Sequence, residues 1–553
     1  MYSDAKGQLT EQKQPAALFD RRSLPWLIVA ALAAFLAFYV RLRLLNVPLE
    51  RDEGEFAYFA QLMLDGIPPY LDAYTLKFPG AALMYALFMV VFGESASGIH
   101  LGLLFSNAAA CLLLFLVCRR LFDSRVALAG AAVYAVMSVS MGVYGVFAHA
   151  THFVVLFALA GFLLLMRALE EGRGALLLAS GFLFGVAILM KQHGVFFALF
   201  AWLYLAATSL RGGTPAAGGK PQALRALSLF TLGGIAPFAL CCLALFLAGT
   251  FDQFWFWTFE YAREYVSSES LAKGVANFRR NFGLILQTTL PLWLLAACGL
   301  VFLFTDKEAR RGRTFVLGFL LFSFLATCPG LYFRRHYFVM LLPACALLAG
   351  LAAVGAGNLL ERRNIGRRSG VAAALLLLAA VSCYAYLERP FFFSLDTATL
   401  ARAVYGDNPF PESVAVGRYL KENSSPGDRI AVLGSEPQIN FYADRRSATG
   451  HIYMYGLMEE QKYAARMQQE LVREVESASP AYVVFVNVRA SWLMRPGSHP
   501  LVFNWAPGYL QRHYDMVGVV DIMPDRTEYV WGGDATSYRP RSRNFLTVFK
   551  RRG

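Results

Sequence analysis

Repeated apolar runs, each close to 20 residues long, constrain the fold of this chain more than any other feature. A helix of about 20 apolar residues spans the roughly 30 Å hydrocarbon core of a bilayer. Hydrophobic residues make up 57% of the 553-residue chain and charged residues only 16%, whereas soluble proteins carry about 25% charged residues. The sequence therefore predicts a polytopic α-helical membrane protein.

Eleven runs are predicted to cross the membrane, and one further run is ambiguous. The run 81–92 is short and follows Phe78, Pro79 and Gly80, so it either crosses, lies along the interface or re-enters. The eleven predicted spans cover residues 25–45, 99–118, 126–142, 151–168, 175–190, 195–209, 227–249, 284–304, 314–328, 336–356 and 370–387.

Loop charge favours eleven crossings, because short cytoplasmic loops are enriched in lysine and arginine. With a cytoplasmic N-terminus and a run 81–92 that does not cross, the basic clusters all fall in cytoplasmic loops. An extra crossing would turn every one of them outward. The net charge of +13 is then explained by topology, and no nucleic-acid partner is expected. The clusters comprise Arg119, Arg120, Arg125, Arg167, Arg173, Arg211, Lys220, Arg225, Lys307, Arg310, Arg311, Arg313, Arg362, Arg363, Arg367 and Arg368.

The chain divides into three predicted parts. Residues 1–23 form a cytoplasmic segment before an uncleaved signal anchor, because the first apolar run is too long for a signal peptide and lacks a cleavage site. Residues 24–387 form the membrane domain, with outer loops at 46–80 and 250–283. Residues 388–553 alternate strand-like runs with helical patterns, which predicts a small α/β domain outside the membrane.

The eight cysteines lie in or at the ends of apolar runs, and none lies in the polar C-terminal third. No Cys-x-x-Cys motif or Cys/His metal spacing is present, so neither a disulfide framework nor a zinc site is expected. The outer loop 250–283 is rich in aromatic residues. It fits either a lid or acceptor surface, or an aromatic belt at the membrane interface.

An acidic segment follows the first span, with Asp52, Glu53 and Glu55 within four residues of one another. Carboxylates close to a membrane lose hydration and are therefore frequently functional. The alternative is structural, because acidic residues suit the N-terminus of an interfacial helix, here about 53–65. The charges alone leave these two interpretations equally open.

Other polar residues fall on the same predicted outer side. Lys77 and Lys191 either bind substrate or anchor the ends of helices near lipid headgroups. His149 and His152 share a helix face, and they are better suited to bonding substrate or the acidic segment than to holding a metal, because no further ligand lies near them in sequence.

Three basic residues on the predicted outer side, Arg334, Arg335 and His336, contradict the trend toward cytoplasmic basic residues. This exception favours a phosphate site, because arginine forks bind phosphate by paired charge-assisted hydrogen bonds. Together with the acidic segment, these cations suit transfer chemistry on a phosphorylated lipid. A carboxylate accepts the proton of the acceptor. Fixed cations stabilise the charge of the leaving phosphate.

The order of these features resembles the GT-C superfamily of glycosyltransferases, in the bacterial branch near protein O-mannosyltransferases and the lipid A aminoarabinose transferase. The resemblance covers about residues 20–360. The family often carries an acid in an Asn-Thr-Glu-like sequence where this chain has His152, so no second acidic partner is expected. The matching elements are Asp52-Glu53 with Tyr58, Lys77-Phe78-Pro79 in place of a Lys-Pro-Pro-like element, Arg119-Arg120-Leu121-Phe122, and the stretch from Arg335 to Pro343.

The resemblance implies a GT-C fold and inverting transfer of a sugar from a polyprenyl-phosphate donor. From the residues themselves no metal ligands are assigned and no cofactor is certain. Asp52 would be the catalytic base or the carboxylate that orients the acceptor, with Glu53 in support. Lys77 and Arg335 would hold the lipid phosphate. The other substrate-binding candidates are Glu55, Tyr58, His149, His152, Lys191, Arg334 and His336.

The acceptor would be lipid A, another glycan or a protein, at the outer face of the bacterial cytoplasmic (inner) membrane. Two other functions stay open from the sequence. The chain could be a transporter or flippase for a lipid-linked saccharide, although no internal repeat is visible. It could also be a membrane-anchored binding or assembly protein whose outer domain does the binding.

Overall fold

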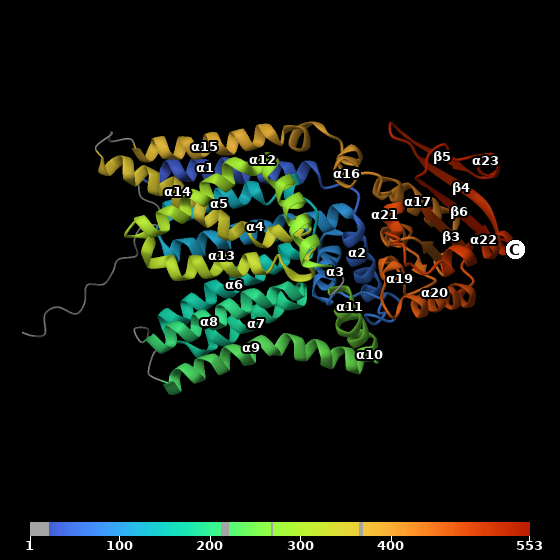
Figure 1. Ribbon diagram of the computed structural model, residues 1–553, viewed down its shortest axis with the longest axis horizontal. Helices are drawn as coiled ribbons and strands as arrows, with labels where there is room; N and C mark the ends of the chain where they lie inside the picture. Colours follow the sequence, from blue (N-terminus) through green and yellow to red (C-terminus); the bar gives the residue numbers. More distant parts are fainter. Residues whose placement is uncertain (1–20, 212–219, 267–268, 364–368) are drawn as a thin grey trace, which may run out of the picture.

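The predicted spans form helices that run along the long axis of the molecule (Figure 1). The computed structural model describes residues 21–211, 220–266, 269–363 and 369–553. Within these ranges, eight helices are long and apolar enough to cross a membrane, and the other three predicted spans form the shorter helices α5, α7 and α13. The bundle helices are α1 (Leu24–Arg43), α4 (Ala96–Leu121), α5 (Ser124–Met137), α6 (Ala150–Glu171), α7 (Gly174–Met190), α8 (Val195–Arg211), α9 (Lys220–Leu247), α12 (Leu271–Thr305), α13 (Arg313–Leu325), α14 (Leu342–Arg362) and α15 (Ser369–Leu387). Most of the predicted segment 1–23, and Arg367 and Arg368 of the basic loops, lie outside the described residues.

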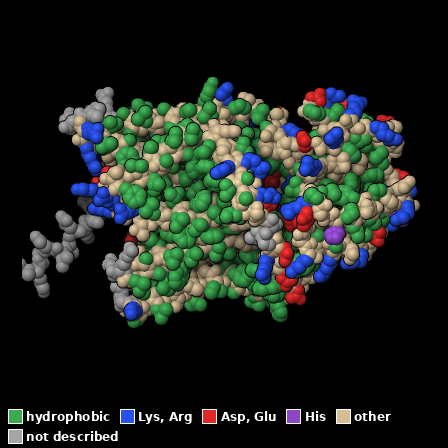
Figure 2. Space-filling model, viewed as in Figure 1, with side chains coloured by type: hydrophobic (Ala, Val, Ile, Leu, Met, Phe, Trp, Pro, Cys, Tyr) green, Lys and Arg blue, Asp and Glu red, His purple; other side chains and the backbone are tan. Residues whose placement is uncertain are grey.

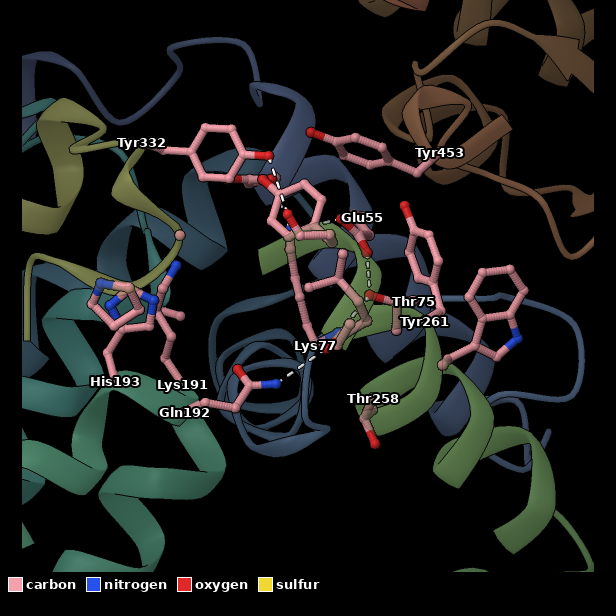
Figure 3. A pocket seen from close by; sticks show the side chains of 18 of the residues that line it. Glu55, Thr75, Lys77, Lys191, Gln192, His193, Thr258, Tyr261, Tyr332 and Tyr453 are labelled. Atoms are coloured by element: carbon pink, nitrogen blue, oxygen red, sulfur yellow. Dashed lines mark hydrogen bonds and ion pairs between the residues drawn. The ribbon is translucent and has the colours of Figure 1, made fainter. Parts of the chain in front are cut away.

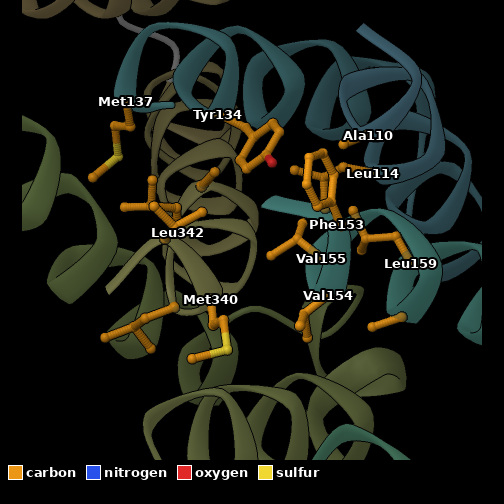
Figure 4. Close-up of a cluster of buried hydrophobic side chains, with 14 of the residues drawn as sticks. Ala110, Leu114, Tyr134, Met137, Phe153, Val154, Val155, Leu159, Met340 and Leu342 are labelled. Carbon is orange, nitrogen blue, oxygen red and sulfur yellow. The ribbon is translucent and has the colours of Figure 1, made fainter. Parts of the chain in front are cut away.

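Helix α14 lies inside the bundle, where it packs against both α5 and α12. Its sequence is rich in alanine and glycine, and small residues allow helix backbones to approach closely within a membrane. A β-carbon at Gly350 would lie 2.7 Å from the backbone nitrogen of Gly130 on α5, so α14 has no room for a side chain at this crossing. Figure 4 shows the interior beside this crossing, where Leu114, Phe153 and Leu342 converge from α4, α6 and α14.

The two ends of the bundle differ in charge. Hydrogen bonds and ion pairs link the ends of several helices on the basic side: Arg125 Nη1 donates to Asn358 Oδ1 at 3.2 Å, and Arg362 lies 3.2 Å from Asp306. Lysine and arginine gather at the end opposite the C-terminal domain (Figure 2). This separation is the one expected for the predicted loop alternation. Which end faces the cytoplasm stays a prediction.

The ambiguous run forms α3 (Gly80–Phe92), which lies at the end of the bundle nearest the C-terminal domain (Figure 1). Its first residue packs against Leu189 at the end of α7, and Tyr85 donates a hydrogen bond to the carbonyl of Ala148 before α6. A 13-residue helix extends about 20 Å, less than the hydrocarbon core. Helix α3 is thus shorter than the eight helices that are long enough to cross among the described residues, and its interfacial position stays a prediction.

The acidic segment forms the first turn of an interfacial helix, α2 (Arg51–Leu64). Glu50 and Glu53 form a capping box: the Glu50 carboxylate accepts from the Glu53 amide at 3.0 Å, and the Glu53 carboxylate accepts from the Glu50 amide at 3.1 Å. This reciprocal pairing satisfies amide groups that have no partner inside the helix. Two of the carboxylates therefore fix the start of α2.

A six-stranded sheet forms the core of the C-terminal domain, in the order β2-β1-β3-β6-β4-β5. Strand β1 pairs in parallel with β2 and β3, and the remaining pairs are antiparallel. Alternate residues of β1 enter two different apolar cores, so helices cover both faces of the sheet. The strands are β1 (Arg429–Leu433), β2 (Arg446–Ser447), β3 (Tyr482–Asn487), β4 (Tyr514–Ile522), β5 (Thr527–Trp531) and β6 (Phe545–Arg551). The helices are α16 (Thr397–Tyr405), α17 (Phe410–Asn423), α18 (Gln438–Ala443), α19 (Tyr455–Met458), α20 (Ala464–Ala478), α21 (Arg489–Trp492), α22 (Leu501–His513) and α23 (Gly533–Ser537).

The C-terminal domain sits directly on α2, and Figure 1 shows α2 and α3 between the bundle and the sheet. Helix α18 packs so closely that a β-carbon at Gly54 would lie 2.6 Å from that of Gln438. The Tyr58 hydroxyl accepts a hydrogen bond from the Ser447 amide at 2.7 Å. These two contacts with the C-terminal domain fix the position of α2.

Candidate active site

A cavity of about 520 Å³ lies between the bundle and the C-terminal domain. Its walls come from α2, the loop 74–77, the end of α7, the predicted aromatic loop, the segment 329–337 and the C-terminal segment 453–457 (Figure 3). The aromatic loop folds into α10 (Phe251–Trp255), the π-helix η3 (Phe256–Tyr261) and α11 (Ala262–Val266). Six of the predicted site residues line this cavity: Asp52, Glu55, Lys77, Lys191, Arg334 and His336.

Asp52, Glu55 and Lys77 form one ionic cluster. Asp52 and Glu55 lie three positions apart on α2 and therefore share a helix face. Lys77 Nζ lies 2.7 Å from Asp52 Oδ1 and 2.6 Å from Glu55 Oε2. Thr75 also donates a hydrogen bond to Glu55. The cluster faces the cavity and carries one more negative than positive charge.

Burial and ion pairing act in opposite directions on these groups. Burial raises the pKa of Asp52, but the basic groups around it, with Lys77 foremost, together outweigh burial and hold the pKa well below its ordinary value. Burial dominates at Glu55 and raises the pKa of its carboxyl. Burial lowers the pKa of Lys77, but the two carboxylates outweigh it and raise the pKa above its ordinary value. Of the two carboxylates, Asp52 is therefore the one held more strongly in its charged form.

Two further cations, Lys191 and Arg334, have no carboxylate partner among the described residues. Lys191 Nζ lies 4.5 Å from the ring centre of Tyr337, and burial lowers the pKa of Lys191 to about 7. Arg334 Nη2 donates to the Tyr265 hydroxyl at 3.2 Å, and its guanidinium lies over the Tyr332 ring. Cations in a cavity without a counter-charge favour an anionic ligand.

Asp52, His149 and His336 offer donor atoms within 4.8 Å of one another, which makes them a candidate metal set. However, the two imidazole rings stack with centres 4.1 Å apart and planes 16° apart, so their in-plane lone pairs run nearly parallel instead of converging. Asp52 Oδ1 is also paired with Lys77. Both rings would have to rotate before the three residues could hold an ion. Burial lowers the pKa of His149 to about 4 and lowers that of His336 as well.

Besides His149, four predicted site residues lie outside the cavity wall. Glu53 accepts from the Ala148 amide and lies 3.0 Å from His100 Nε2, in addition to its role in the capping box. Tyr58 contacts the C-terminal domain. His152 is buried in the bundle, and neither of its ring nitrogens has a hydrogen-bond partner among the described residues.

Arg335 also lies outside the cavity wall. Its side chain is bound to backbone carbonyls of the short helix η1 (Met141–Val143). Its Nε donates to the Gly142 carbonyl and its Nη2 to the Met141 carbonyl, both at 2.8 Å. Its neighbour Arg334 reaches the cavity instead. The structure therefore places Arg334, and not Arg335, on the cavity wall, and which of the two binds a phosphate stays a prediction.

The sequence interpretation missed the C-terminal contribution. Tyr453 and Tyr455 line the cavity from the C-terminal domain, more than 370 residues after α2. The side chain of Arg51, next to Asp52, is clamped by that domain: its guanidinium bonds Ser435, Tyr455, Asn408 and Glu436. Alternating tyrosines between apolar residues at 453–457 were the one available signal, and it is weak.

Comparisons with known proteins agree with this architecture. The sequence model of the dolichyl-phosphate-mannose-protein mannosyltransferase family matches residues 77–231. None of the curated protein sequences matches this chain. The crystal structure of ArnT from Cupriavidus metallidurans bound to undecaprenyl phosphate is 15% identical, with a TM-score of 0.59 over 95% of this chain and 98% of that chain.

A second similar structure is the oligosaccharyltransferase of Archaeoglobus fulgidus tethered to an acceptor peptide. It is 15% identical, with a TM-score of 0.53 over 92% of this chain and 74% of that chain. The same archaeal enzyme, AglB, in complex with an inhibitory peptide and a dolichol-phosphate, gives a TM-score of 0.52 at 14% identity. At these identities the likeness concerns the fold. The chain therefore shares the GT-C fold of these structures, and residues 77–231 within its bundle are similar to the mannosyltransferase family.

Proposed function

We propose that this protein transfers a sugar from a polyprenyl-phosphate carrier to an acceptor molecule. The observation that carries the proposal is the cavity in which the charged carboxylate of Asp52 lies with Lys77, Lys191 and Arg334. Transfer from a lipid phosphate requires a base for the acceptor and positive charge for the leaving phosphate. Both are present within one site.

Lys191 and Arg334 are the phosphate ligands in this proposal, with Lys77 as the third cation. Arg334 replaces Arg335, because the Arg335 guanidinium is committed to backbone carbonyls. When the acceptor oxygen bonds to the anomeric carbon, the bond from that carbon to the phosphate oxygen breaks. The electron pair of that bond leaves with the phosphate, whose added charge the cations stabilise.

Asp52 accepts the proton of the acceptor hydroxyl during this step. In the free cavity its low pKa makes it a weak base, since Lys77 neutralises its charge. A donor phosphate that draws Lys77 away would weaken this ion pair and raise the basicity of Asp52. Donor binding and base activation would therefore be linked through Lys77.

The apolar half of the cavity supports a lipid-linked donor. Met190, Val195, Phe196 and Phe259 line it, and Val195 is 47% exposed on the side of the bundle. A phosphate bound by the cations would thus lie next to an apolar surface able to receive the first isoprene units. The proposed site is at the outer face of a bacterial cytoplasmic membrane, and the acceptor is lipid A, another glycan or a protein.

The test is a transfer assay on the purified protein in lipid nanodiscs. A panel of undecaprenyl-phosphate sugars is supplied with lipid A, glycan and peptide acceptors, and the release of undecaprenyl phosphate is measured. Asp52→Asn should abolish release while expression and melting temperature stay unchanged. Asp65→Asn, on an exposed aspartate just after the same helix, is the matched control and should be fully active.

The same assay separates the rival functions. A flippase would move the lipid-linked sugar across a vesicle membrane without releasing lipid phosphate, and it would need no base. A binding or assembly protein would do neither. Full activity of Asp52→Asn would refute the role of Asp52 as base.

A further inference from the structure

Tyrosines form much of the cavity wall, and most of their hydroxyls already make hydrogen bonds. The Tyr455 hydroxyl accepts from Arg51 at 2.6 Å and donates to the Ala490 carbonyl at 2.6 Å. The Tyr261 hydroxyl donates to Glu459 at 3.0 Å. These groups hold the wall together and are not free to bind a ligand.

The hydroxyl of Tyr453 differs, because it has no hydrogen-bond partner among the described residues. The side chain is only partly buried, and Figure 3 shows it reaching from the C-terminal domain over the cavity, across from Lys191. Tyr337 is the other cavity tyrosine whose hydroxyl has no hydrogen-bond partner among the described residues, but its ring lies under the Lys191 ammonium. Tyr453 thus offers a polar group that no described side chain engages, beside Lys77 on the cavity wall.

Tyr453 also lies close to the reacting groups. Its ring centre is 5.7 Å from Lys77 Nζ, which is itself 2.7 Å from Asp52 Oδ1. The ring packs edge-on against Tyr455 at 4.8 Å between centres. The backbone beneath it is fixed, because the next residue, Met454, is fully buried and its amide donates to Ser435 Oγ at 2.9 Å.

We propose that Tyr453 contacts the transferred sugar ring and is a specificity-determining residue of the site. This inference rests on the proposed function. A pyranose presents an apolar face of C–H groups and a rim of hydroxyls. A tyrosine ring matches the first by its face and the second by its hydroxyl. The sugar follows the phosphate toward the base Asp52, and Tyr453 lies beside Lys77, the ion-pair partner of Asp52.

The test compares two ligands that differ only in the sugar. The probes are undecaprenyl phosphate alone and undecaprenyl phosphate carrying the sugar that the transfer assay selects. Binding to the full-length protein in nanodiscs is measured by titration calorimetry. Tyr453→Ala should weaken binding of the sugar-bearing lipid by about tenfold and leave binding of the bare lipid phosphate unchanged.

Three further variants complete the design. Tyr453→Phe keeps the ring and should lose only part of the affinity for the sugar-bearing lipid. Arg334→Gln should weaken both ligands equally, because it acts on the phosphate. Tyr529→Ala, on an exposed tyrosine of β5, should change neither. A melting curve for each variant shows whether it is folded, and Tyr453→Phe still decides the question if Tyr453→Ala is unstable.

The outcomes separate the inference from the proposed function. If Tyr453→Ala weakens both ligands equally, or neither, Tyr453 does not contact the sugar, although the wild-type protein still transfers it. If the wild-type protein binds neither lipid and transfers no sugar, the proposed function itself fails.

Discussion

At the scale of single residues, the two adjacent arginines have different surroundings. Arg334 faces the cavity, whereas Arg335 bonds two backbone carbonyls of η1. We expect Arg334→Gln to raise the donor KM by about tenfold at unchanged stability, which corresponds to about 1.4 kcal/mol of phosphate binding. Initial rates at varied donor concentration measure this effect.

Arg335→Gln should do the opposite. It leaves two partly buried carbonyls without a donor, which costs about 1–3 kcal/mol of stability. We therefore expect a lower melting temperature and a nearly unchanged donor KM. A larger rise in donor KM for Arg335→Gln than for Arg334→Gln would restore the order predicted from the sequence.

Lys191 predicts a pH dependence of donor binding. Burial lowers its pKa to about 7, so the charged form prevails below pH 7 and is lost as the pH rises through 7. We expect the donor KM to rise several-fold between pH 6 and pH 8.5, because the phosphate loses one cation. Lys191→Arg keeps its charge at every pH in this range and should flatten the profile. An equally steep profile in that variant would assign the titration to another group.

At the scale of elements, α2 is held by a buried ion pair to the C-terminal domain. Arg51 Nη2 lies 2.6 Å from Glu436 Oε1, and the Glu436 side chain is fully buried. Removing one partner leaves an uncompensated charge, so Arg51→Met should cost about 3–5 kcal/mol. The double variant Arg51→Met/Glu436→Met should recover much of that stability.

Activity should not recover with stability in the double variant. Arg51 precedes Asp52 directly, and its guanidinium fixes the first turn of α2 through four contacts. We expect kcat to stay reduced, by about tenfold or more, because small misplacement of a catalytic group is costly. Thermal melting and saturating transfer rates, measured on the same samples, check both parts. Full recovery of kcat would show that the pair serves stability alone.

Some of these elements could be predicted from the sequence, and others could not. Apolar length predicts the helices of the bundle, eight of which are long and apolar enough to cross a membrane among the described residues, and the α/β domain follows from its alternating patterns. Which of the two side chains, Arg334 or Arg335, reaches the cavity could not be predicted, because it depends on an irregular backbone. Leu331 and Phe333 adopt positive φ angles of 55° and 44°, which no hydrophobic periodicity encodes. Tyr453 joins the site only through tertiary packing of a distant domain.

At the scale of the whole molecule, the basic loops and the C-terminal domain lie at opposite ends of the bundle (Figure 2). Single-cysteine variants in a background without the native cysteines test the topology that this implies. Ser425→Cys in the C-terminal domain should react with a membrane-impermeant maleimide in intact spheroplasts. Lys307→Cys should react only after the membrane is opened. Both positions are exposed. Labelling of both positions from the same side would contradict eleven crossings.

The C-terminal wall of the cavity has a consequence for biosynthesis. Asp52 and Lys77 are made within the first seventh of the chain, whereas segment 453–457 is made when more than four fifths is complete. A nascent chain therefore carries the ionic cluster long before it carries the wall that closes the cavity. Under the proposed function, we expect no sugar transfer before this wall is made, so truncation before residue 453 should yield an inserted but inert product.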